Sequence, residues 1–159
     1  MSYYHEEQTF SALMIGAITA AVALPVAFIL FEALIRPGFV VPSLAALLIL
    51  VPILVLFLLA RLVVDVDRDE IRIGFHFLWP TRRIPIISIR RARMEHYSPL
   101  FDYGGWGVRL SPRGWAFTVG GHDGVLVETN DGKRVLIGSH RPQELEAAIA
   151  RAIADRAGR

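Results

Sequence analysis

The chain has 159 residues, 53% of them hydrophobic, a formal net charge of +2 and no cysteine. Disulfides, cysteine-ligated metals and thiol nucleophiles are therefore excluded. Residues 1–60 hold one Arg and three Glu (−2), whereas residues 61–159 hold 16 Lys or Arg against 12 Asp or Glu (+4), which is too mild a charge to indicate nucleic-acid binding.

Two apolar segments dominate the first part of the chain. Phe10–Phe31 and Phe39–Ala60 are each 22 residues long and contain no Asp, Glu, Lys, Arg or His. At about 1.5 Å per residue each makes a helix of roughly 33 Å, enough to cross a hydrocarbon core of about 30 Å. Neither has the polar face of a soluble helix. The sequence predicts a transmembrane hairpin over 10–60, with helices at 10–35 and 39–60, after a short N-terminal segment, 1–9.

The charges around the hairpin predict its orientation. Met1–Glu7 has no Lys or Arg, and the first apolar run is longer than the core of a cleaved signal peptide, so we expect a retained helix. The connecting turn offers only Arg36, whereas several arginines, beginning with Arg61, follow the second helix. The positive-inside rule then places both termini in the cytoplasm.

Small residues form a row along the first helix: Ala12, Gly16 and Ala20. Their four-residue spacing lets two helices approach closely, within the hairpin or between copies, although alanine is also common in membrane helices. At the outer end of this helix, Glu32 and Arg36 are four residues apart and are expected to pair or to extend toward the interface.

From Leu62 the apolar residues recur with a period of two, which is typical of strands with one buried face. A polar turn, Asp67–Glu70, separates the first two runs, and Asp131-Gly132 predicts a hairpin between the last two. The expected strands are 62–66, 71–77, 83–89, 92–97, 106–110, 115–119, 125–129 and 134–137. Only the end is helical, with Pro142 in a first turn and an apolar stripe at Leu145, Ile149 and Ile153.

The expected fold class is therefore a membrane α-hairpin joined to an α+β, mainly-β domain over 61–159. We expect seven or eight short antiparallel strands in a strongly bent sheet or open barrel, because a single sheet must hide its apolar face and its edges. The amphipathic C-terminal helix is expected to cover one mouth.

Two motifs suggest a family: Asp-Tyr-Gly-Gly-Trp-Gly-Val-Arg (102–109) and Asp-Gly-Lys-Arg-Val-Leu-Ile-Gly-Ser (131–139), followed by Pro142 and a short helix. Over about residues 60–155 this order resembles the bacterial pleckstrin-homology-like (PH-like) domains that follow membrane hairpins. The resemblance implies a seven-stranded bent antiparallel barrel capped by the last helix, acting as a binding or scaffolding module without catalysis. It implies the inner membrane of a bacterium as the location.

The first loop between strands departs from this family. Phosphoinositide-binding pleckstrin-homology domains cluster basic residues there, whereas here the loop is Asp67–Glu70, which is net negative. We therefore carry over no ligand residues from the resemblance.

The arginines form the densest run of charge in the soluble domain. They are candidates for contact with anionic lipid, each contributing about 1 kcal/mol if it lies near the surface. The alternative is a solvated strand edge that also helps to set topology. The candidates are Arg61, Arg82, Arg83, Arg90, Arg91 and Arg93.

A second candidate surface is the aromatic, glycine-rich stretch Tyr97–Trp106. A partner peptide is expected to add a strand or fill an aromatic groove there, and copies of the chain are possible partners. Trp106 itself is expected to plug the barrel. The candidate contact residues are Tyr97, Leu100, Phe101 and Tyr103.

The sequence shows no catalytic constellation. The five histidines have no metal-ligand spacing, and no serine elbow, phosphate-binding loop or paired inward carboxylates are present. We expect no enzyme, cofactor, metal, nucleic acid or small-molecule substrate. The leading hypothesis is a membrane-anchored module that binds protein, including copies of itself. The alternatives are an anionic-lipid module and an accessory subunit of a larger membrane complex.

Overall fold

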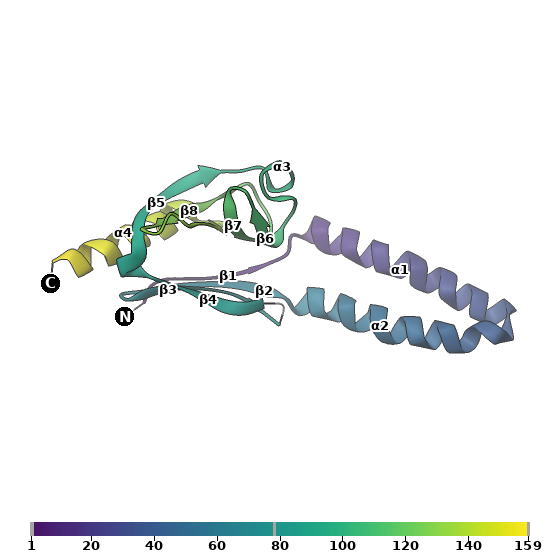
Figure 1. The fold of residues 1–159 in the computed structure, drawn as a ribbon. Helices are drawn as coiled ribbons and strands as arrows, with labels where there is room; N and C mark the ends of the chain where they lie inside the picture. Colours follow the sequence, from purple (N-terminus) through teal and green to yellow (C-terminus); the bar gives the residue numbers. More distant parts are fainter. Residues whose placement is uncertain (1, 78, 159) are drawn as a thin grey trace. The chain divides into compact units, whose positions relative to one another are not determined.

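The computed structural model describes residues 2–77 and 79–158, and the chain divides into two units (Figure 1). One unit is residues 10–60, the hairpin unit. The other, the soluble unit, joins the N-terminal segment before residue 10 to the chain from residue 61 onward. Met1, Leu78 and Arg159 lie outside the described residues. Each unit is described by itself.

The hairpin unit contains two long helices, as the sequence predicts. Its elements are α1 (Ala12–Ile35), the short 3-10 helix η1 (Pro37–Phe39) and α2 (Val40–Leu59). The Ser11 hydroxyl caps α1 by accepting a hydrogen bond from the Met14 N–H at 3.3 Å. Met14–Ile35 and Val40–Leu59 are each long and apolar enough to cross a membrane, and almost none of their residues are buried within the structure.

The two helices contact each other through larger side chains. The better protected positions of α1 recur every three or four residues, at Ile15, Ile18, Val22, Val26 and Ile29. The Ser43 hydroxyl of α2 lies 3.3 Å from the Ile29 carbonyl oxygen and 2.6 Å from that of Phe39, and donates toward both. At the outer end, Arg36 pairs with Glu32 at 3.3 Å, as the sequence predicts.

The small-residue row lies away from this contact. Ala12, Gly16 and Ala20 are all exposed, and a Cβ atom added at Gly16 would meet nothing within 4 Å. Close packing of this row within the hairpin is therefore not what the structure shows. Its packing against another copy stays a prediction.

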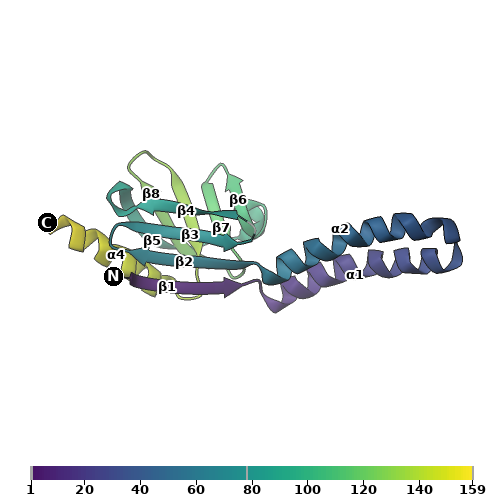
Figure 2. The same cartoon turned by 90° about the horizontal axis from the view of Figure 1, so that it is seen from below.

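The soluble unit begins with a four-stranded antiparallel sheet, sheet A, in the order β1-β2-β3-β4 (Figure 2). Its strands are β1 (Ser2–Thr9), β2 (Arg61–Asp67), β3 (Glu70–His76) and β4 (Trp79–Pro85). The predicted polar turn after β2 is confirmed. Two details differ from the sequence analysis: the N-terminal segment is a strand, and the strand expected at 83–89 instead begins at Trp79 and ends at Pro85.

Sheet A has two distinct ends. Thr9 lies opposite Arg61, and Arg61 lies opposite His76. We call this the attachment end, because Phe10 and Ala60 are the next residues along the chain. The opposite end, the far end, carries the β2–β3 turn and the pair Glu70 and Pro85.

Strand β1 places polar side chains on the buried face of sheet A. The Glu6 side chain accepts hydrogen bonds from the Tyr4 hydroxyl (2.6 Å), the Ser139 hydroxyl (2.7 Å) and the His140 N–H (3.0 Å). The Gln8 amide donates to the Gly138 carbonyl at 2.8 Å. Glu6 is only 4% exposed. Three donors satisfy a buried carboxylate that would otherwise be costly, so this network fixes the register of β1.

The remaining strands form sheet B, in the order β5-β8-β9-β7-β6. They are β5 (Ile89–His96), β6 (Gly107–Ser111), β7 (Gly114–Thr118), β8 (Asp123–Thr129) and β9 (Arg134–Gly138). The 3-10 helix η2 (Ile86–Ser88) connects the two sheets. The β8–β9 hairpin is as predicted. Strands β7 and β9 pair in parallel, however, so the expectation of a wholly antiparallel sheet is wrong at this pair.

The sheets face each other and the C-terminal helix α4 (Pro142–Ala157) packs on strands of both. Apolar strand positions such as Val64, Ile73 and Val127 are fully buried, and α4 adds Leu145 and Ile149 of the predicted stripe. The sequence analysis expected about seven strands in one bent barrel. The described residues instead form two sheets of four and five strands, and they close no barrel.

Replacing Glu6 with Ala is expected to destabilise the soluble unit by about 2–3 kcal/mol, because three buried donors lose their acceptor. The matched control is Glu7→Ala, whose exposed carboxylate pairs with Arg61 at 3.4 Å and is worth less than about 0.5 kcal/mol. Urea unfolding of the full chain in detergent measures both through tryptophan emission, since all three tryptophans lie after residue 61. Equal losses in the two variants would contradict the network.

Candidate functional site

Exposed apolar side chains mark the candidate binding surface of the soluble unit. Among the described residues of the soluble unit, the most exposed large apolar side chains are Phe101 (93%), Phe77 (69%) and Leu110 (67%). In both views β6 and β7 lie nearer the attachment end than β8 does (Figures 1 and 2). The ring of Trp79, which begins β4 at that end, lies 6.4 Å from that of Trp115 in β7. Exposed apolar groups therefore gather toward the attachment end.

The predicted aromatic contact loop divides into a buried and an exposed part. It folds as the short helix α3 (Pro99–Tyr103), whose start is tied by the Asp102 carboxylate accepting from the Ser98 N–H at 2.8 Å. Gly104 ends it in the left-handed region, φ 73°. Leu100 and Phe101 project outward.

Tyr97 and Tyr103 belong to the core instead of the contact surface. They are 1% and 5% exposed, their rings meet edge to face at 6.0 Å, and they cover Ala116, Leu126 and Leu136 of sheet B. Burial raises the pKa of Tyr97 to about 12 and also raises the pKa of Tyr103. Both are therefore removed from the predicted partner contacts. The sequence missed this because a tyrosine's spacing in a loop does not reveal what lies beneath it.

Trp106 was expected to plug a barrel, and the described residues form none. Its side chain is partly buried, and its indole N–H is buried without a hydrogen-bond acceptor among the described residues.

Strand β6 is an edge of sheet B and pairs on one side only, with β7. Pro112 and Arg113 form a two-residue turn between Ser111 and Gly114. In such a hairpin the closing pair is hydrogen-bonded, so the backbone N–H groups of Val108 and Leu110 face the open side. No backbone hydrogen bond from another described residue reaches that side.

The predicted lipid-contacting arginines are spread over the soluble unit. Arg61 lies at the attachment end and pairs with Glu7. Arg82 and Arg83 lie in β4 opposite Ile73 and Arg72, between the two ends. The remaining three lie in β5, where Arg93 pairs with Glu95 at 3.2 Å, and where Arg90 and Arg91 have no acidic partner within 4 Å among the described residues.

Arg90 and Arg91 follow a corner close to the far end. There the Ile86 N–H donates to the Asp69 carbonyl oxygen at 2.8 Å, and the Asn130 N–H donates to the Ser88 carbonyl oxygen at 2.8 Å. Seven residues of β2 separate the two ends of sheet A, about 3.3 Å for each, so this corner is more than a Debye length of about 8 Å from Arg61. The arginines therefore do not form one patch.

A hollow of about 400 Å³ lies between β4 and the β8–β9 turn. Arg82, Arg83, Asn130, Asp131 and Lys133 are among its lining residues. Hydrogen bonds from Lys133 and Thr129 lower the pKa of Asp131 to about 2, so this carboxylate is ionised. Lys133 is thereby neutralised locally.

Arg82 is the unusual member of this hollow. Its guanidinium lies 5.3 Å from the centroid of the Trp115 ring, and burial lowers its pKa. No carboxylate among the described residues lies within 4 Å of it. A partly buried guanidinium with free donors is suited to a carboxylate or phosphate oxygen.

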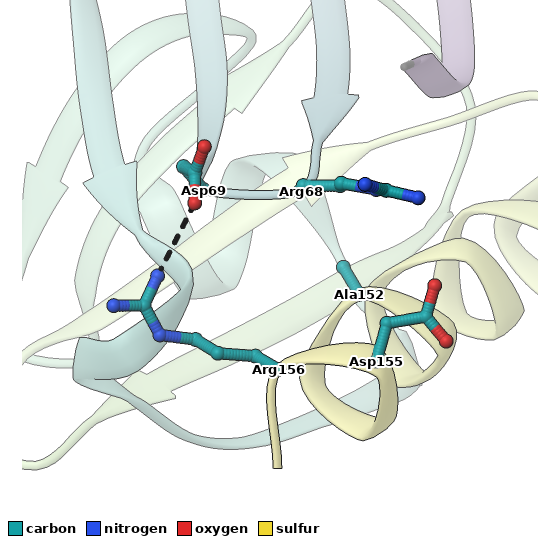
Figure 3. A pocket seen from close by; sticks show the side chains of 5 residues that line it. All are labelled: Arg68, Asp69, Ala152, Asp155 and Arg156. Carbon is teal, nitrogen blue, oxygen red and sulfur yellow. Dashed lines mark hydrogen bonds and ion pairs between the residues drawn. The ribbon is translucent and has the colours of Figure 1, made fainter. Parts of the chain in front are cut away.

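A second hollow of about 430 Å³ lies between the β2–β3 turn and the end of α4 (Figure 3). Arg68, Asp69, Ala152, Asp155 and Arg156 line it. Figure 3 shows Arg156 reaching Asp69, at 3.4 Å. Because the Tyr3 hydroxyl also donates to Asp155, these charges are already engaged within the chain, and the hollow offers no free group to a ligand.

Two of the histidines, His5 and His96, pair with carboxylates. His5 contacts Asp65 at 2.6 Å, and this hydrogen bond raises the pKa of His5; His96 contacts Asp123 at 2.8 Å. Within the described part of the chain, no three His, Asp or Glu side chains come together as metal ligands do.

Comparison with known proteins adds no assignment. No family model matches the sequence, and neither the curated proteins nor the solved structures contain a match.

The two aromatic residues of α3 are expected to respond differently to truncation. Tyr103→Ala should destabilise the soluble unit by about 3–4 kcal/mol, because it leaves a cavity over sheet B. Phe101→Ala, two residues earlier in the same helix, should change stability by less than about 0.5 kcal/mol. Urea unfolding followed by tryptophan emission measures both. A Phe101 effect as large as that of Tyr103 would place the Phe101 ring in the core.

Proposed function

We propose that this chain is a membrane-anchored binding module that holds an extended segment of a second protein chain along strand β6. In this proposal α1 and α2 cross the inner membrane of a bacterium and both termini face the cytoplasm. The apolar length of both helices and the arginines after the second one support this orientation. The facing sheets and C-terminal helix support the PH-like resemblance, whereas the parallel β7–β9 pair departs from it.

The open edge of β6 carries the proposal. The other edges are protected: β4 contains Pro80 and Pro85, β5 carries three arginines, and β1 is packed by α4. Strand β6 has no proline and one charged side chain, that of Arg109. Unpaired backbone donors and acceptors on such an edge are suited to strand addition.

The exposed apolar side chains give this edge its selectivity. Leu110 projects from β6 itself, and Leu100 and Phe101 project from α3, which contacts β6. A segment added to β6 would bury these side chains while its backbone completes the sheet. The partner is therefore an extended segment with apolar side chains. A second copy and a subunit of a larger membrane complex are two such partners, and cross-linking separates them.

A photo-cross-linking amino acid at position 110 or 101 is expected to give one discrete adduct in native membranes, because the partner segment lies against both positions. Position 87 is the matched control, since Ile87 is 64% exposed but lies in η2 at the corner between the sheets. Peptide mapping identifies the cross-linked segment. An adduct of two 17.7 kDa chains would show a second copy.

The edge itself is tested by Val108→Pro. This change removes an N–H on the open side and should abolish the adduct at position 110, while the unfolding midpoint stays near that of the wild type. Leu110→Lys, like Val108→Pro, should weaken partner binding. The proposal fails if positions 87 and 110 give the same adducts, or if the adduct survives a folded Val108→Pro variant.

Arg82 favours a second candidate function, the binding of an anionic group in the hollow beside β4. The free guanidinium over Trp115 is the observation behind it. Both an anionic lipid headgroup and a soluble phosphate would present the oxygen atoms that it lacks. Arg83 and Lys133 also line the hollow, but they pair with Glu70 (3.9 Å) and Asp131 (2.5 Å), which leaves Arg82 as the principal donor.

Inorganic pyrophosphate is expected to change tryptophan emission saturably when added to the full chain in neutral-lipid nanodiscs at constant ionic strength. Arg82→Gln should abolish the change, because the anion then loses its forked donor, and Arg90→Gln should retain it. A parallel comparison of phosphatidylglycerol with phosphatidylcholine nanodiscs reports the lipid source. A linear response that is equal in all variants would show nonspecific screening and would refute the site.

A further inference from the structure

Two exposed aromatic side chains lie at the attachment end, and neither belongs to the proposed partner surface formed by β6 and α3. Phe77 directly follows His76, which lies opposite Arg61, and Trp79 lies opposite Phe75. Phe77 is 69% exposed and Trp79 is 47% exposed. They face a hollow of about 370 Å³ on sheet A, which Phe75 and Pro80 also line. Large aromatic groups left in solvent in this way need a reason in the function.

The covalent path of the chain gives that reason. Thr9 is paired with Arg61. The apolar segment 10–60 directly follows Thr9 and directly precedes Arg61. Both links to the hairpin unit therefore leave from the end of sheet A that carries Phe77. At about 3.3 Å per residue, no slack remains between the first residue of β2 and the apolar helix before it. Because Ala60 alone separates the last residue of α2 from Arg61, the attachment end is the part of sheet A joined to the apolar helices by the fewest residues.

The backbone at Phe77 is held in an unfavourable conformation. Its φ is +67°, and it is the one described non-glycine residue with a positive φ. A side chain in this region costs about 1–2 kcal/mol, and such strain is typical of residues whose position serves a function. The ring meets His76 edge to face at 5.6 Å, while the Trp79 ring lies 6.4 Å from Trp115. Both rings are thus fixed by neighbours while staying accessible.

We propose that Phe77 and Trp79 form an interfacial anchor that inserts into the headgroup region of the bilayer crossed by the hairpin. Tryptophan favours this zone because its ring is largely apolar while its indole N–H donates a hydrogen bond, and the wholly apolar ring of Phe77 suits the adjoining acyl region. Arg61, which lies opposite His76, the residue before Phe77, offers a cation to lipid phosphates. The ligand class is a phospholipid headgroup and its adjoining acyl region.

This contact adds a third attachment to the two covalent ones. Insertion of these two rings would restrict the rotation of the soluble unit relative to the membrane. The edge of β6 would then keep a constant height and orientation above the lipid. The anchor does not depend on a partner being bound to β6.

Spin labelling tests the anchor, because the chain has no cysteine and any introduced thiol is the sole labelling site. A nitroxide at Phe77→Cys in the full chain is reconstituted into liposomes of phosphatidylcholine and phosphatidylglycerol. Ile87→Cys is the matched control, exposed to a similar degree but at the corner near the far end. We expect a collision rate with oxygen, relative to a water-soluble nickel complex, several-fold higher at 77 than at 87. Equal ratios would overturn the anchor.

A second measurement keeps Phe77 in place. Brominated phospholipid should quench part of the tryptophan emission of the wild-type chain, and Trp79→Phe should remove most of that quenching, whereas Trp115→Phe should retain it. Quenching that does not depend on Trp79 would also overturn the anchor. Neither readout uses the partner of β6, so a failed cross-link at position 110 and a failed anchor are distinguishable.

Discussion

The pairing of β1 with β2 is the constraint on which the rest of the structure depends. These strands are neighbours in sheet A although residues 10–60 separate them in the chain. Loop closure over that length carries an entropic cost that grows slowly with loop size, and a rigid helical hairpin lowers it by bringing its own two ends together. The whole apolar hairpin is therefore an insertion between two adjacent strands.

The buried carboxylate of Glu6 makes this pairing specific. A shift of β1 by one residue would turn Glu6 toward solvent and put Glu7 inside, away from the hydroxyls of Tyr4 and Ser139. The same network joins the start of the chain to the segment before α4. A soluble fragment that begins at residue 61 would lack β1 and leave these groups without partners. Fragment studies of this unit therefore need residues 2–9 as well.

The two ends of sheet A also separate two kinds of surface. Exposed apolar groups, including Phe77, Phe101 and Leu110, gather toward the attachment end, while Arg90 and Arg91 lie near the far corner. An arrangement of this kind favours apolar and backbone-mediated contact over binding through a continuous basic face. Arg82, the central residue of the proposed anion site, lies between the two ends. The proposed partner and the proposed lipid contact thus use neighbouring but different residues.

The sequence by itself determined the hairpin, the strand pattern after Leu62 and the final helix, because these depend on local periodicity and on runs of apolar residues. It also determined the Glu32 and Arg36 pair, which are four residues apart on one helix. Only the tertiary structure decided that Ser2–Thr9 is a strand, that β7 and β9 are parallel, and that Tyr97 is buried while Phe101 is exposed. Each of these features depends on which segment, distant in the chain, packs against the residues concerned. A local sequence pattern does not identify that neighbouring segment.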